Sequence, residues 1–187
     1  MGPTHIPRFF VKQKITMMVN RYEILAATPD GKPGQMLAFA EQKRFAFKEQ
    51  VTFFADASKT QPVFGFKARQ VMDLNAGYDV RDADGVQIGF FRKDFGASLI
   101  RSTFHVEGPG YVGTGQERSM PVALLRRFVD LPLPIHFDYA DASGQPLLSV
   151  TRGFSIRDNY EVSVPDARID FRVAAAVAVA MDALMAR

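Results

Sequence analysis

The sequence predicts a mainly β protein, a closed antiparallel barrel of about twelve strands around a buried C-terminal helix. Five segments dense in turn residues separate stretches of alternating apolar and polar residues, which is the pattern of consecutive hairpins. The 187 residues include seventeen Phe and no Trp, and aromatic residues favour strands. From Val173 to Met181 no side chain is polar, so a helix there must be surrounded on every face.

The turn-rich segments begin at Thr28, Asp56, Asp82, Gly108 and Asp141. The clearest of them is DADG (residues 82–85), which contains Asp-Gly between two apolar stretches and is a strong hairpin signal. The expected strands lie on both sides of these turns, with one more at the start of the chain and one more before the C-terminal helix: Phe9–Ile15, Tyr22–Ala27, Met36–Gln42, Phe45–Ala55, Val63–Ala68, Tyr78–Arg81, Val86–Arg92, Ser102–Glu107, Tyr111–Glu117, Ile135–Tyr139, Leu147–Thr151 and Tyr160–Val164.

Two segments between these strands have helical patterns, Lys93–Arg101 and Met120–Asp130, the second with Pro121 near its first turn. An antiparallel sheet of so many strands normally closes or splits. Closure around a core satisfies the sheet edges and encloses the apolar helix. We therefore expect one barrel domain over residues 9–187, after a loose segment over residues 1–8.

The central helix is expected over residues 168–187, with Pro165 ending the last strand and Asp166 capping the first turn. Spacings of four, four and three place its larger side chains on one ridge, which we predict to be its structural core: Val173, Val177, Met181 and Leu184.

This helix could instead be a membrane anchor, but a spanning helix needs about 20 predominantly apolar residues. Asp170 and Arg172 at one end and Asp182 near the other leave a shorter uncharged stretch. The chain has no Cys and no apolar leader sequence, so we expect a cytoplasmic protein. Its net charge of +3 is compatible with an anionic partner but identifies none.

Two motifs resemble known sites but read better as turns. GPGYVG (residues 108–113) matches the dinucleotide-binding pattern, yet a strand is expected after it where that pattern needs a helix. Asp82 and Asp84 in DADG lack the further ligands of a calcium-binding EF-hand loop. We therefore interpret both segments as hairpin turns.

The sequence contains no recognisable catalytic set. His5, His105 and His136 lie far apart and lack the spacing of a zinc site, and Ser98 lies outside a nucleophile elbow. We expect no enzymatic activity, no metal and no cofactor.

Eight basic residues recur at strand ends or on the second expected helix, and we treat them as lipid head-group candidates: Lys43, Arg44, Lys67, Arg69, Arg92, Lys93, Arg126 and Arg127. Clustered Lys and Arg attract anionic lipid by about 1 kcal/mol per residue near a membrane surface. The alternative is a solvated rim that discourages pairing between strand edges. Adjacent residues of a strand point to opposite faces, so these pairs need not converge.

The segment DASKTQPVFGFKARQVMDLNAGYDVRDADGVQIGFFRKDF (residues 56–95) and the ending RIDFRVAAAVAVAMDAL resemble the LURP-one-related family, a relative of the phospholipid scramblases and, in fold, of the tubby C-terminal domain. The similarity extends from about Phe9 onward. It implies a closed tubby-like barrel around a central hydrophobic helix. Tubby relatives bind phosphoinositide head groups through basic surface residues, scramblases move lipid in response to calcium, and many members have no assigned activity.

Three functional hypotheses follow. The first is a non-enzymatic module that binds anionic phospholipid head groups, peripherally at the inner membrane surface. The second is a scaffold that binds a protein partner, and the third is a small-ligand carrier that uses a cavity in the barrel. Nucleic-acid binding is not expected, because there is no recognition motif and no concentrated basic stripe.

Overall fold

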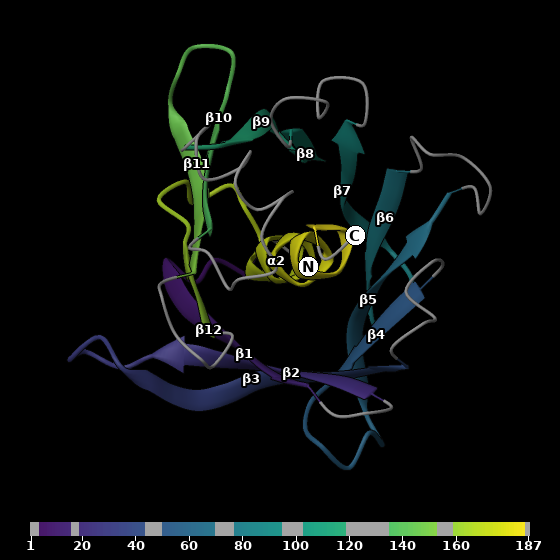
Figure 1. Ribbon diagram of the computed structural model, residues 1–187. Coiled ribbons are helices and arrows are strands. Elements are labelled where there is room, and N and C mark those ends of the chain that lie inside the picture. The colour runs from purple at the N-terminus through teal and green to yellow at the C-terminus, as the bar shows by residue number, and fades with distance from the viewer. Residues whose placement is uncertain are drawn as a thin grey trace.

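The computed structural model describes residues 4–15, 19–43, 50–69, 77–94, 103–118, 135–152 and 159–185. In these ranges, antiparallel strands form a closed barrel around one C-terminal helix, α2 (Phe171–Met185), as Figure 1 shows. The strands are β1 (Arg8–Ile15), β2 (Val19–Ala27), β3 (Pro33–Lys43), β4 (Gln50–Phe54), β5 (Pro62–Ala68), β6 (Gly77–Asp82), β7 (Gln87–Asp94), β8 (Thr103–Gly108), β9 (Tyr111–Glu117), β10 (Ile135–Ala140), β11 (Pro146–Arg152) and β12 (Asn159–Ser163).

Each strand pairs with its neighbours in the sequence, and β1 pairs with β12 to close the barrel. The closing register runs from Arg8 opposite Ser163 to Lys12 opposite Asn159. The predicted fold class is therefore confirmed, and each strand in the described ranges has a hydrogen-bonded neighbour on both sides.

Helix α2 fills the centre of the barrel. All residues from Val173 to Met181 are at most 1 % exposed, and they face inward-pointing Phe, Tyr, Val and Leu side chains of the strands. The hydroxyl of Tyr139 donates a hydrogen bond to Sδ of Met181, 3.1 Å away, and burial raises the pKa of Tyr139. Of the predicted core ridge, Val173, Val177 and Met181 are buried, while the side chain of Leu184 lies outside the described part.

The helix begins at Phe171, three residues later than predicted, and Asp170 is its N-cap. The Asp170 carboxylate accepts from the backbone N–H of Arg172 at 2.9 Å, and its carbonyl accepts from the N–H of Val173 at 3.0 Å. Asp166, the predicted cap, instead accepts from the N–H of Arg168 in the preceding turn. Asp is a favourable N-cap residue at either position. The helix begins after Asp170 because residues 166–169 form a tight turn.

The described part of the N-terminal segment that we expected to be loose is hydrogen-bonded to the region around the helix start. The N–H of Thr4 donates to the Asp170 carboxylate, and the carbonyl of Thr4 accepts from the N–H of Phe171 at 2.9 Å. Three residues on, the carbonyl of Pro7 accepts from the N–H of Val164 at 2.8 Å.

The predicted helix at Lys93–Arg101 is wrong at its start. Lys93 and Asp94 end β7 and pair with Phe104 and Thr103 of β8, because pairing with a neighbouring strand outweighs the local helical pattern. Residues 95–101 of this segment, all of Met120–Asp130, and residues 45–49 of the fourth expected strand lie outside the described residues.

The GPGYVG segment is a hairpin between β8 and β9, as predicted, with Gly110 in the left-handed region at φ 79°. Within β9, Gly113 and Gly115 face the interior. A Cβ atom on either would collide with a core side chain, that of Leu147 or of Tyr139. The glycines therefore make room for the core, which explains this part of the motif without a nucleotide.

Candidate functional site

The outer face of β5, β6 and β7 carries four cationic side chains and two carboxylates. Alternation along the strands turns Phe64, Phe66, Val80 and Phe91 inward, and it places the charged residues outside. The cations are Lys67, Arg69, Arg81 and Arg92, and the carboxylates are Asp79 and Asp94. We call this surface the cationic face.

Two of these cations are unpaired. Lys67 and Arg92 are exposed, and neither has an ionic partner among the described residues. They lie on β5 and β7, with β6 between them, because Lys67 pairs with Asp79 and Asp79 pairs with Phe90, two residues before Arg92. Strand spacing and rise place their Cα atoms about 12 Å apart, within joint reach of their long side chains.

The other two cations share Asp79. Its Oδ1 accepts from Nε of Arg69 at 2.8 Å, and its Oδ2 lies 3.5 Å from Nη2 of Arg81. The Arg69 guanidinium also lies 4.1 Å from the ring centroid of Phe90. Phe90 in turn covers Gly77, where any side chain would overlap its ring. Asp79 is thereby neutralised, and Arg69 and Arg81 are held in place.

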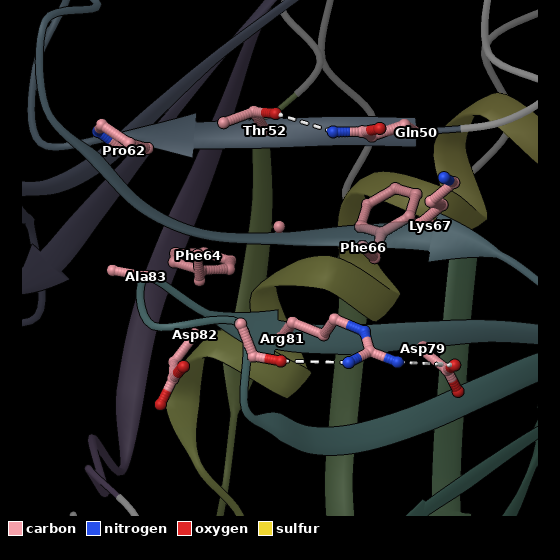
Figure 2. Close-up of a pocket in the computed structure, with 12 residues that line it drawn as sticks. Gln50, Thr52, Pro62, Phe64, Phe66, Lys67, Asp79, Arg81, Asp82 and Ala83 are labelled. Carbon is pink, nitrogen blue, oxygen red and sulfur yellow. Dashed lines mark hydrogen bonds and ion pairs between the residues drawn. The ribbon is translucent and has the colours of Figure 1, made fainter.

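A hollow of about 250 Å³ opens on this face over Gly65 (Figure 2). Gly65 lies directly between Thr52 of β4 and Arg81 of β6, so the missing side chain leaves a gap between two larger neighbours. The next row across the same strands is Gln50, Lys67 and Asp79. We call this feature the Gly65 hollow.

Polar and apolar residues together line the Gly65 hollow. The polar lining residues include Lys67, Gln50, Thr52 and Arg81, which are labelled in Figure 2. The rest of the lining includes Pro62, Phe64, Phe66 and Ala83. The carboxylate of Asp82 points away from Arg81, and its Oδ1 accepts from the backbone N–H groups of Asp84 and Val86 in its own turn.

Of the predicted head-group candidates, the structure brings Lys67, Arg69 and Arg92 onto one surface. Lys93 lies inside the barrel, 9 % exposed, with Nζ 6.0 Å from the ring centroid of Phe104. It cannot act with Arg92, because adjacent strand residues point to opposite faces. The side chain of Lys43, and Arg44, Arg126 and Arg127 entirely, lie outside the described part.

The sequence reasoning missed Arg81, Asp79, Thr52 and Gln50, which belong to this face only through the register of four strands. Gly65 was the available signal. Gly65 lies between two phenylalanines inside a strand, and a glycine at such a position often marks a place where a ligand or another backbone comes close.

Two of the histidines, His105 and His5, have structural surroundings. His105 contacts Thr114 Oγ1 through Nδ1 at 3.1 Å and Asp94 Oδ2 through Nε2 at 3.4 Å. Nε2 of His5 lies 2.9 Å from the carbonyl oxygen of Val164. Within the described ranges, no three His, Asp or Glu side chains are grouped so as to hold a metal ion, and no helix has the length and apolar character needed to cross a bilayer.

Comparison with known proteins identifies the family. A family model described as LURP-one-related matches residues 36–182, well over half of the chain. No curated protein and no solved structure matches the chain. The matched range begins within β3, contains the cationic face and ends within α2, and the chain belongs to the LURP-one-related family.

Proposed function

We propose that this protein is a non-enzymatic barrel that binds anionic phospholipid head groups at a membrane surface through its cationic face. The observation that carries the proposal is the presence of two exposed cations, Lys67 and Arg92, on one surface without ionic partners among the described residues. An unpaired cation gives up no protein contact when it meets a phosphate. Each such residue contributes about 1 kcal/mol near an anionic surface.

The paired residues support the same role. Arg69 and Arg81 neutralise Asp79, so the carboxylate at the centre of the face does not repel an anion as strongly as a free one would. The face is also formed by consecutive strands of a closed barrel, so its side chains project from a rigid support. We place the protein peripherally, on the cytoplasmic side of the membrane.

The two alternatives have less support. The exposed large apolar side chains in the described part are Val86, in the turn before β7, and Val112, on β9. Single exposed residues of this kind are normal and indicate no protein-binding patch. A carrier would need space inside the barrel, where the residues from Val173 to Met181 are buried at the centre.

The test is co-sedimentation of the full chain with vesicles at low salt, comparing phosphatidylcholine alone with a mixture containing phosphatidylglycerol. We expect binding to the acidic vesicles that weakens as salt is added. The variant Lys67→Gln/Arg92→Gln should lose most of it. The matched control, Lys14→Gln/Lys32→Gln, removes the same charge from exposed residues elsewhere and should bind nearly as the wild type does.

Two results would overturn the proposal. One is wild-type binding to acidic vesicles no stronger than to neutral vesicles at low salt. The other is an equal loss in the control variant, which would mean that net charge, and not the cationic face, causes the association.

A further inference from the structure

We infer that the Gly65 hollow is a specific site for a single phosphate group, held by Lys67, Arg81, Thr52 and Gln50. The inference deepens the proposed function and rests on it in one respect, since the hollow lies on the cationic face. It goes further because it predicts that phosphate binds saturably at one position. Surface charge alone would attract anions without a defined binding position.

The room for a phosphate comes from the missing side chain of Gly65. A Cβ atom there would lie 2.7 Å from the carbonyl oxygen of Val51, so the backbone of β4 excludes any larger residue. Thr52 and Arg81 stand on either side. The volume of about 250 Å³ exceeds that of a bare phosphate and leaves space for a short substituent.

The two cationic side chains beside this space have N–H donors free for a ligand, and Arg81 is also held in position by the protein. Lys67 has no ionic partner in the described part. Arg81 donates through Nη1 to the carbonyl of Gly85 at 3.0 Å and approaches Asp79 through Nη2, contacts that hold its guanidinium along the edge of the hollow (Figure 2). A guanidinium has five N–H donors, so these contacts leave others for a ligand.

Neutral donors complete the set. The hydroxyl of Thr52 accepts from Nε2 of Gln50 at 3.5 Å, which leaves its own O–H to donate. Two cations and two neutral donors around one concave position suit an anion with several acceptor oxygens, and phosphate has three or four. Because Arg81 is anchored before any ligand arrives, little side-chain freedom is lost on binding.

The same chemistry could come from a lipid head group or from a free phosphorylated molecule. We therefore propose titrating the folded full chain with sn-glycerol 3-phosphate while following backbone amide resonances, with sodium chloride at equal ionic strength as the control. Parallel samples receive the phosphatidylglycerol vesicles. Saturable shifts are expected at Thr52, Gly65 and Arg81, and chloride should not reproduce them.

Two variants separate the site from general charge. Thr52→Val keeps a β-branched side chain but removes the hydroxyl, and it should weaken glycerol phosphate binding by about threefold to tenfold. Lys67→Gln should weaken it at least as much. Thr114→Val, on the outer face of β9, makes the same chemical change elsewhere and should leave affinity unchanged. Unchanged melting temperatures exclude a folding effect.

The outcomes are distinguishable. Shifts spread evenly over exposed cations, or equal affinity in Thr52→Val and wild type, would overturn the hollow as a site, while acidic-vesicle binding could still uphold the proposed function. Saturable glycerol phosphate binding without vesicle binding would support the hollow, overturn the membrane role, and identify a free phosphorylated ligand. Binding of both would identify the lipid head group as a source.

Discussion

The backbone N–H of Thr4 donates a hydrogen bond to the carboxylate of Asp170, 3.0 Å away, and so joins the first described residue to the cap of the last helix. The same carboxylate binds Nε and Nη2 of Arg172 at 2.9 and 2.6 Å. Asp170 is 3 % exposed. One buried side chain therefore caps the central helix, pairs a cation and holds the N-terminal segment.

Replacement of Asp170 by Ala should destabilise the protein by about 3 kcal/mol, because it removes a helix cap and leaves the Arg172 guanidinium without its partner in a largely buried position. Urea unfolding at pH 7 measures the change. Asp170→Asn keeps an acceptor for the cap and should cost less. An equal loss in the two variants would show that the retained acceptor contributes nothing and that the charge of Asp170 accounts for the whole effect.

Gly89 of β7 allows the helix to approach the strand. A Cβ atom at this position would lie 2.6 Å from Cγ2 of Val173. Gly89→Ala should therefore cost about 1–3 kcal/mol through overpacking. The double variant Gly89→Ala/Val173→Ala should lose less stability than the two single variants together, since the second change removes the colliding methyl group. Strict additivity would contradict this contact.

Val177 is fully buried at the middle of α2. Val177→Asp places a charge inside the barrel, where it has no water and no arranged partner, and the variant should fail to fold as a soluble protein. Val177→Ala leaves only a small cavity and should remain folded, at a cost of about 2 kcal/mol. Circular dichroism and thermal melting distinguish them. Wild-type stability in the Asp variant would mean that α2 is not the core.

Acid should weaken the turn before the helix. The Arg168 guanidinium donates hydrogen bonds to Asp166, which lowers the pKa of this carboxyl below its usual 3.8 in the folded protein. A lowered folded-state pKa means that the stabilisation is fully present above about pH 3.8 and disappears as pH falls through the folded value. Asp166→Asn cannot titrate, so its stability should fall less between pH 5 and pH 2. Parallel curves for variant and wild type would contradict the coupling.

The sequence was sufficient to predict the barrel, its hairpins and the buried helix because each rests on local patterns. Strands alternate, turns contain Asp and Gly, and the residues from Val173 to Met181 are apolar on every side. The helix start was less certain, since Asp166 and Asp170 are both suitable caps. The choice between them depends on contacts with Thr4, which lies 166 residues before Asp170 in the sequence.

The candidate site was predicted only in part because it depends on which residues lie opposite one another. Strand alternation alone separates Arg92 from Lys93, and the structure places the first outside and the second within the barrel. The positions of Thr52 and Arg81 beside Gly65 require the register of β4, β5 and β6. The strand register depends on pairing between residues far apart in the chain, which cannot be read from one sequence.

The position of α2 after all twelve strands has a consequence for synthesis on the ribosome. The inner faces of β1 to β12 bury their aromatic side chains against a segment that is translated after all of these strands. Until residues beyond Asp170 emerge, the nascent strands can pair but have no core to close upon. A chain stopped before Phe171 should therefore aggregate or be degraded, and productive folding should begin only once α2 has emerged.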